Sequence, residues 1–151
     1  MLLLAVTPLQ AGPSVLAVKR ALGEIETGAS QPGPSAADRV RGSHQEVSRY
    51  QILPKVWAQY SDSRDYTNPA CAWPVAYRIL TDRAEWFRHA VGRVPCPFDL
   101  YVLWNAPAHY RQTGFDRHRV RPVIAERALR FAALVEHYSE GRGPELACPS
   151  P

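Results

Sequence analysis

The chain of 151 residues lacks long hydrophobic runs, closely spaced cysteine pairs and any recognisable pattern of metal ligands. The apolar run near the N-terminus is far shorter than the roughly 20 residues that cross a bilayer as a helix, so we expect no membrane span. The three cysteines show no CxxC or His/Cys ligand spacing, and the five histidines are scattered. We therefore expect neither a metal site nor a cofactor.

The small number of cysteines leaves two interpretations open. Cys71 and Cys96 could form a disulfide in an oxidising compartment, which would leave Cys148 in the tail, and free buried thiols fit equally well. The first residues, MLLLAVTPLQAGP, combine a short apolar run with small residues near Ala11, but no basic region precedes them. They resemble the end of an incomplete export signal. We expect residues 1–12 to be a signal remnant or flexible N-terminus, and the protein to belong to the cell envelope, periplasmic or secreted.

The balance of residue types is that of a globular protein, with 46% hydrophobic and 21% charged residues. We expect one domain over residues 13–140 and a loose tail over residues 141–151. The net charge of +4 suggests an acidic partner, and wall polymer, nucleic acid and membrane surface all fit this charge. Because no nucleic-acid-binding motif is recognisable, we expect no nucleic-acid partner. We also expect a monomer.

Hydrophobic periodicity predicts a mainly α-helical fold with little or no sheet, in which several helices begin at prolines. A small hairpin within residues 43–53 is the one strand pattern considered, and loops are expected over residues 29–42 and 108–121. The first helix is expected after Pro13 and Ser14, with an apolar stripe of Val15, Leu16, Val18, Leu22 and Ile25 that ends at Glu26 and Gly28. The later helices are expected from Pro54, from about Trp73 and Pro74, after a capping box of Asp82 and Glu85, over residues 98–104, and from Pro122 to before Gly141.

Glu26 is the residue with the clearest chemical potential, because it ends the first predicted helix. A carboxylate there lies beside the negative end of the helix dipole, which disfavours its charged form. If the site is also partly desolvated, the acid stays protonated near neutral pH, as a general acid must. Glu24, two residues earlier, points to another side of the helix and is expected on the surface.

Three short segments occur in a recognisable order: IETG at the end of the first helix, SRYQILP before the second, and LWNAPA after the buried helix. Together they resemble the lysozyme-like superfamily, in particular its lytic transglycosylase branch, which includes soluble lytic transglycosylases and goose-type lysozyme. That family shows an acid followed by serine, then glycine-x-x-Gln-Ile/Leu-x-Pro, and then an aromatic-Asn-Ala-Gly corner. The resemblance spans roughly residues 15–138 and implies a compact, mainly helical, lysozyme-like domain with a substrate cleft.

The resemblance assigns roles to particular residues. Glu26 matches the catalytic acid, with Thr27 in place of the usual serine, and Gln51 matches the glutamine that lines the cleft. Trp104 and Asn105 match the aromatic-Asn pair whose asparagine binds or supports the sugar acetamido group. Tyr50 adjoins a motif and is also expected in the cleft.

The chain departs from the family pattern at three places. Ser48 and Pro107 stand where the family commonly has glycine, and the last helix offers Arg130 and Phe131 where a tyrosine is usual. These departures concern the geometry of the sugar subsites more than the chemistry.

The activity implied by the resemblance is cleavage of the β-1,4 bond between N-acetylmuramic acid (MurNAc) and N-acetylglucosamine (GlcNAc) in peptidoglycan. Glycosidic cleavage needs a proton on the leaving oxygen. In the family, the same glutamate then acts as base toward the sugar 6-hydroxyl and closes a 1,6-anhydro ring. Hydrolysis would instead need a base for water, and Glu46 is the nearest candidate for a second carboxylate. The alternative is a non-catalytic module that binds wall glycans or serves as a scaffold on the same fold.

Overall fold

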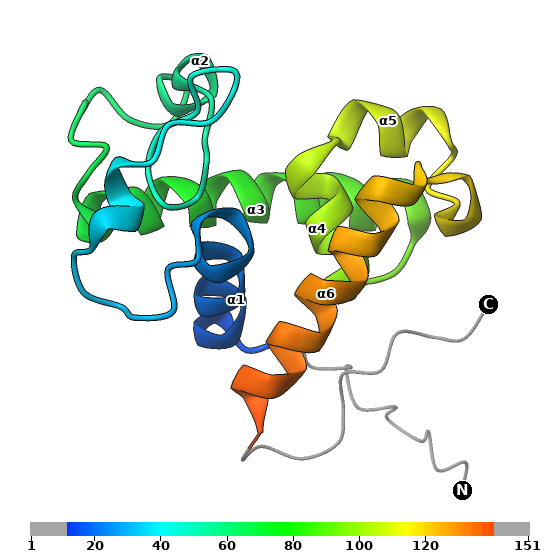
Figure 1. The fold of residues 1–151 in the computed structure, drawn as a ribbon. Coiled ribbons are helices and arrows are strands. Elements are labelled where there is room, and N and C mark those ends of the chain that lie inside the picture. The colour runs from blue at the N-terminus through cyan, green and yellow to red at the C-terminus, as the bar shows by residue number, and fades with distance from the viewer. Residues whose placement is uncertain (1–11, 141–151) are drawn as a thin grey trace, which may run out of the picture.

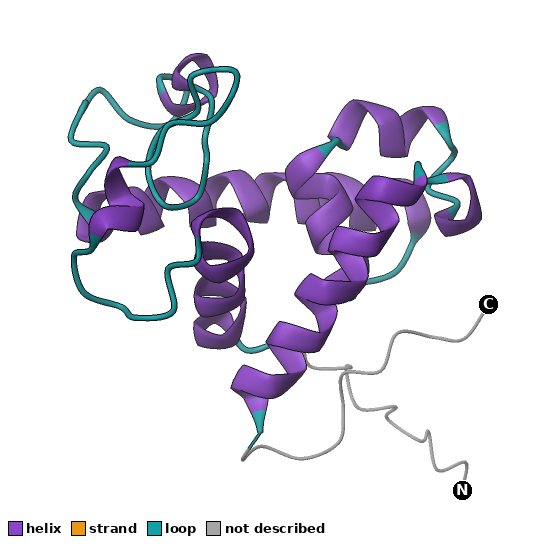
Figure 2. Ribbon diagram, in the orientation of Figure 1, coloured by secondary structure: helices purple, strands orange, loops and turns teal. Residues whose placement is uncertain are grey.

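The computed structural model describes residues 12–140, and in this range the chain is mainly helical and forms no strand (Figures 1 and 2). This confirms the predicted helical class. The elements in chain order are α1 (Val15–Thr27), the 3₁₀ helix η1 (Ala36–Arg39), α2 (Pro54–Trp57), α3 (Pro69–Val91), α4 (Pro97–Asn105), α5 (Pro107–Gln112), the 3₁₀ helix η2 (Arg117–Arg119) and α6 (Pro122–Ser139).

The first helix ends as its sequence predicts. Gly28 adopts a left-handed conformation with φ 75°, and its N–H donates to the carbonyl oxygen of Glu24 at 2.8 Å. Glycine suits this position because it has no Cβ to clash there. The start of the predicted apolar stripe is wrong, however. Val15 and Leu16 are 50% and 63% exposed, whereas Val18 and Leu22 are buried in the core.

The third helix is longer than predicted. It begins at Pro69, where the Asn68 side chain accepts a hydrogen bond from the N–H of Ala70, and it continues through Pro74 to Val91. The predicted start at Trp73 is therefore wrong, and so is the separate helix after Asp82. The physical reason is that Ile79, Leu80 and Phe87 keep the helical spacing of the core across Asp82, so nothing separates the two halves.

Helices α4 and α6 pack against each other, and α1 packs against α6 (Figure 1). In α4 the run of Tyr101, Val102 and Leu103 is fully buried, and Phe131 and Val135 of α6 are buried as well. A helix that is apolar on every side belongs in the centre of a fold. The prediction of a buried helix over residues 98–104 is confirmed.

The polar segment after α4 is more ordered than predicted. In place of a loop it contains α5 and η2, and Tyr110 of α5 is fully buried. The Tyr110 hydroxyl donates to Oδ1 of Asp99 at 2.6 Å, and Asp99 also accepts from the Arg93 guanidinium at 2.6 Å. This buried carboxylate ties α5 to the start of α4. The polar composition of this segment predicted a loop, and the helix was missed because Tyr110 is its one buried side chain.

The segment between α1 and α2 is held by a buried ion pair. The predicted loop over residues 29–42 contains η1, and the predicted hairpin reduces to one antiparallel bridge between Val47 and Ile52. Nε of Arg49 lies 2.6 Å from Oδ1 of Asp38, with both side chains almost fully buried. The Arg49 guanidinium also donates to the carbonyl oxygens of Gln31 and Gly33, at 2.7 and 2.6 Å. An irregular segment with few apolar residues is thereby fixed in place.

The remaining predictions concern the cysteines, the two ends of the chain and membrane-spanning helices. Cys71 has a free thiol, so of the two interpretations left open by the sequence, a disulfide between Cys71 and Cys96 is excluded. Cys148, the tail over residues 141–151 and nearly all of the N-terminal segment over residues 1–12 lie outside the described residues. Within residues 12–140, no helix has the length and apolarity that crossing a membrane requires.

Candidate functional site

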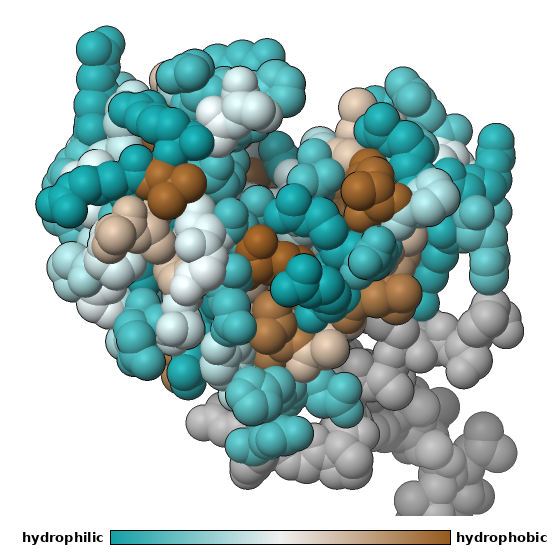
Figure 3. Space-filling model, viewed as in Figure 1, coloured by the Kyte–Doolittle hydropathy of each residue, from teal (hydrophilic) through white to brown (hydrophobic). Residues whose placement is uncertain are grey.

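A cleft of about 660 Å³ lies between the segment around α2 and the ends of α1, α4 and α6. Figure 3 shows the upper edge of the molecule indented between its two halves. The volume is within the range of ligand sites, roughly 300–1,000 Å³. Five of the residues predicted for the site line this cleft: Glu26, Glu46, Gln51, Trp104 and Asn105.

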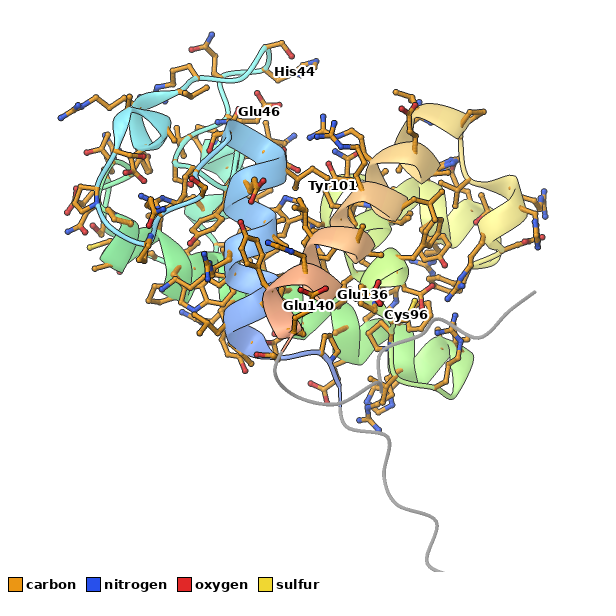
Figure 4. All side chains as sticks on the ribbon, turned by 60° about the horizontal axis from the view of Figure 1, so that its bottom comes forward. His44, Glu46, Cys96, Tyr101, Glu136 and Glu140 are labelled. Carbon is orange, nitrogen blue, oxygen red and sulfur yellow. The ribbon has the colours of Figure 1, made fainter. Side chains whose placement is uncertain are left out.

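Glu26 is held at the cleft wall by two other helices. Its side chain is only 8% exposed. The hydroxyl of Tyr101, from α4, donates to Oε1 at 2.9 Å, and Nη2 of Arg127, from α6, donates to Oε2 at 3.2 Å. Tyr101 lies between α1 and α6 in Figure 4. Both carboxylate oxygens therefore have a fixed partner, and the acid has one defined orientation.

The surroundings of Glu26 raise its pKa above the ordinary value of 4.5. Burial is the main cause, because it penalises the charged form. The positive charge of Arg127 and the hydrogen bond from Tyr101 act against burial, and the negative charge of Glu46 adds to the increase. The sequence predicted the direction of this shift from the helix dipole together with partial desolvation, and burial is the main cause in the structure.

Glu46 is the second carboxylate in the cleft and has the opposite character. Its Oε2 accepts a hydrogen bond from the N–H of His44 at 2.8 Å, and its Oε1 lies 3.4 Å from Nδ1 of the same residue. Burial alone would raise the pKa of Glu46, but the backbone hydrogen bonds and His44 hold it below its ordinary value. Figure 4 shows His44 and Glu46 on the segment above the end of α1. Two carboxylates whose pKa values move apart suit the roles of acid and base.

Gly42 gives Glu46 and Gln51 the space they occupy. A Cβ on Gly42 would lie 2.6 Å from Oε1 of Gln51 and would overlap Oε2 of Glu46. Gln51 is held by its side-chain nitrogen, which donates to the carbonyl oxygens of Val40 and Ser48, both at 3.1 Å. The amide therefore fixes the backbone at the cleft rim. Amide side chains that are shielded from solvent commonly satisfy backbone groups in this way.

Trp104 and Asn105 form the opposite wall. Trp104 is 9% exposed, and the Arg83 guanidinium donates to the carbonyl oxygens of Leu103 and Trp104, at 2.9 and 2.7 Å. These bonds satisfy the last carbonyls of α4. Asn105 ends α4 and is exposed, and Pro107 begins α5 after Ala106 turns the chain. The corner is thus a junction of two helices, for which a proline at the first helical position is well suited.

Two predicted site residues lie outside the cleft lining. Tyr50 is 1% exposed, packs against Trp73 at 5.6 Å between ring centroids, and borders a smaller cavity beside α1. The hydroxyl of Thr27 lies 3.0 Å from the carbonyl oxygen of Arg49 and 3.1 Å from that of Gly23. Thr27 therefore links the end of α1 to the segment that carries Gln51, which is a positioning role.

Ser48, which stands where the resembled motif has glycine, adopts a left-handed backbone conformation. Its φ is 63°, in the left-handed region that disfavours side chains. Its hydroxyl accepts a hydrogen bond from the N–H of Tyr50 at 3.2 Å, which offsets part of the strain. Gln51, with φ 51°, is strained in the same way. The chain therefore accommodates serine at a position whose conformation glycine adopts most easily.

Tyr101 and Arg127 are site residues that the sequence analysis missed. Tyr101 lies within the helix predicted over residues 98–104, and its ring packs against Phe131 in the core, but its hydroxyl reaches Glu26. The only available signal was a tyrosine in an otherwise apolar helix, since a buried hydroxyl normally needs a partner. Glu24 is partly buried rather than exposed, and its carboxylate accepts a hydrogen bond from Tyr138.

In the part of the chain that the structure describes, no group of three or more His, Cys, Asp or Glu side chains could hold a metal ion. Comparisons with protein-family models, with curated proteins and with solved structures find no match to this chain. The function is therefore inferred from the site itself and from the three sequence motifs that meet there.

The close approach at Gly42 predicts a specific loss of stability. Gly42→Ala should lower the free energy of unfolding by about 0.5–1.5 kcal/mol, because the new Cβ pushes aside the ends of the Glu46 and Gln51 side chains, which can move but lose hydrogen bonds. Gly33→Ala is the matched control: it lies in the same segment, and its Cβ would meet no atom within 4 Å. Urea unfolding of both variants measures the difference. Equal effects would show that the two side chains do not depend on Gly42.

The raised pKa of Glu26 predicts how stability depends on pH. Because the native state binds this proton more tightly than the unfolded chain, its contribution is complete below about pH 4.5 and is lost as the pH rises through the folded pKa. Glu26→Gln removes the titration. The stability of the unmodified protein relative to this variant should therefore fall with rising pH, measured by urea unfolding at a series of pH values. If the unmodified protein instead became more stable relative to this variant as the pH rises, the charge of Arg127 would outweigh burial in setting the pKa of Glu26.

Proposed function

We propose that this protein cleaves the β-1,4 bond between MurNAc and GlcNAc in peptidoglycan, as a lytic transglycosylase or lysozyme-type glycosidase with a lysozyme-like fold. The observation that carries the proposal is Glu26, a buried acid with a raised pKa on the wall of an open cleft. The residues of the three motifs that resemble this family meet around that cleft. The substrate implies a place in the cell envelope.

In the proposed mechanism, Glu26 donates its proton to the glycosidic oxygen as the bond to the leaving sugar breaks. Tyr101 orients the carboxyl group, and Tyr101 and Arg127 both stabilise the carboxylate that forms after proton transfer. The Glu26 carboxylate then accepts the proton of the MurNAc 6-hydroxyl, whose oxygen closes the 1,6-anhydro ring. Asn105, exposed at the opposite wall, is the candidate donor to the sugar acetamido group.

Glu46 supports a hydrolytic version of the same reaction. It is charged at neutral pH and lines the same cleft, so it can take a proton from water, although its lowered pKa makes it a weaker base than an ordinary carboxylate. In this version Glu26 acts only as the acid.

A non-catalytic glycan-binding module is the second candidate, and the ion pair between Glu26 and Arg127 favours it. A nearby cation stabilises the charged carboxylate, which opposes the protonated form that a general acid needs. Binding of glycan strands without any turnover by the unmodified protein would support this second function.

Replacing Glu26 by Gln tests the proposed chemistry. The variant should release soluble fragments from purified peptidoglycan at least about a thousandfold more slowly, because an amide can neither donate nor accept the proton. Glu24→Gln is the control: it lies on the same helix and contacts Tyr138, away from the cleft. Its rate should stay near that of the unmodified protein. Turnover retained by Glu26→Gln would exclude Glu26 as the acid.

The products distinguish the two reactions. We expect 1,6-anhydro ends, which mass spectrometry detects as fragments one water lighter than hydrolysed ends. Glu46→Gln should then leave the rate within a few-fold of the unmodified protein. Hydrolysed ends together with a loss of about a hundredfold or more in Glu46→Gln would instead assign Glu46 as the base.

A further inference from the structure

Arg127 is placed to contact a ligand as well as Glu26. Its Nη2 makes both recorded hydrogen bonds, to Oε2 of Glu26 at 3.2 Å and to the carbonyl oxygen of Ile25 at 3.3 Å. The guanidinium lies over the Tyr101 ring, 5.7 Å from its centroid. Yet the side chain is 41% exposed and lines the cleft, whereas that of Glu26 is 8% exposed. An arginine carries five N–H donors in a planar fork, so a group entering the cleft can reach it.

Among the residues that the structure describes, Lys55, Arg83 and Arg127 are the cationic side chains that line the cleft, and of these only Arg127 is both fixed and next to the acid. Arg83 is occupied by the carbonyl oxygens at the end of α4, and Lys55 is exposed on α2. Arg127 is braced by α1 and paired with the acid itself. A carboxylate on a bound ligand would form a bidentate pair most favourably with such a fixed arginine.

The ion pair also has a consequence for the acid. Arg127 opposes the effect of burial on Glu26, and a ligand carboxylate that pairs with Arg127 would neutralise this opposition. The same ligand would cover the cleft and exclude water, which strengthens the effect of burial. An anionic ligand would thereby favour the protonated acid, whereas a neutral ligand would leave the ion pair intact.

We propose that Arg127 is the specificity residue of the cleft and that it selects glycans with a free carboxylate beside the scissile bond. The inference rests on the proposed function for its effect on catalysis. The lactyl carboxylate of MurNAc is the group of this kind in peptidoglycan strands from which the stem peptides have been removed. Arg127 exchanges its Glu26 partner for this carboxylate when the strand binds.

The test compares two substrates on each protein. One is peptide-free peptidoglycan strands with free lactyl carboxylates, and the other is the same strands with these groups converted to carboxamides. The unmodified protein should show a kcat/KM on the order of tenfold higher for the acidic strands. Arg127→Met should reduce this ratio to about one. Because each ratio compares two substrates on the same protein, any effect of the substitution on Glu26 that is common to both substrates cancels.

The matched control is Arg130→Met, one turn further along α6 and exposed. It should keep the ratio of the unmodified protein, although the net charge changes equally. Arg127→Lys keeps the charge without the planar fork and should show an intermediate ratio. If Arg127→Met does not fold, the ratio of Arg127→Lys still tests the inference, because an intermediate ratio supports it and an unchanged ratio contradicts it. An Arg127 variant with the full preference, or an unmodified protein with no preference, would overturn the inference.

Binding measurements separate this inference from the proposed function. In Glu26→Gln, calorimetry should give a Kd about tenfold lower for acidic strands than for carboxamide strands, and adding Arg127→Met should remove the difference. If the unmodified protein binds acidic strands selectively but cleaves none, the proposed function fails while carboxylate recognition stands. Equal Kd values for both strands in Glu26→Gln would reject the recognition itself.

Discussion

The desolvation of one carboxyl group is the constraint on which the rest of the site depends. Glu26 ends α1, and its burial requires α4 and α6 to pack against that end, because they supply Tyr101 and Arg127. A buried carboxyl group without partners would be strongly destabilising, whereas one with two partners can be kept near a useful pKa. The apolar surface of α4 thus also shapes the site: its burial brings the Tyr101 hydroxyl to Glu26 from inside the core.

The other wall of the cleft, formed by the segment between α1 and α2, depends more on hydrogen bonds than the wall formed by α4 and α6. The segment between α1 and α2 has little regular structure, and hydrogen bonds around Arg49 hold it in place together with the buried side chains of Val47, Tyr50 and Ile52. Thr27 connects this segment to the end of α1 through the carbonyl oxygen of Arg49. The position of Glu46 relative to Glu26 therefore depends on polar contacts as well as on the burial of the neighbouring Val47. We expect this wall to adjust more readily to a ligand than the wall formed by α4 and α6.

Sequence patterns predicted the elements whose apolar spacing is regular and failed where tertiary contacts decide. The buried helix α4 and the left-handed end of α1 at Gly28 follow from local rules. The continuous helix α3 does not, because Asp82 and Glu85 look like a start signal when the core contacts of Phe87 are not known. For the site, motif order brought Glu26, Gln51 and Asn105 together, but no local signal connected Glu26 with Arg127, a hundred and one residues away.

The pairing with Arg127 bears on what kind of acid Glu26 is. A general acid needs a proton before the reaction and must carry a stabilised charge after it, and no single environment serves both states equally well. Burial favours the first state, while Arg127 and Tyr101 favour the second. An arginine that can leave Glu26 for a ligand carboxylate, and return once the proton has been transferred, would serve each state in turn. Its 41% exposure, against 8% for its partner, is what makes such an exchange physically possible.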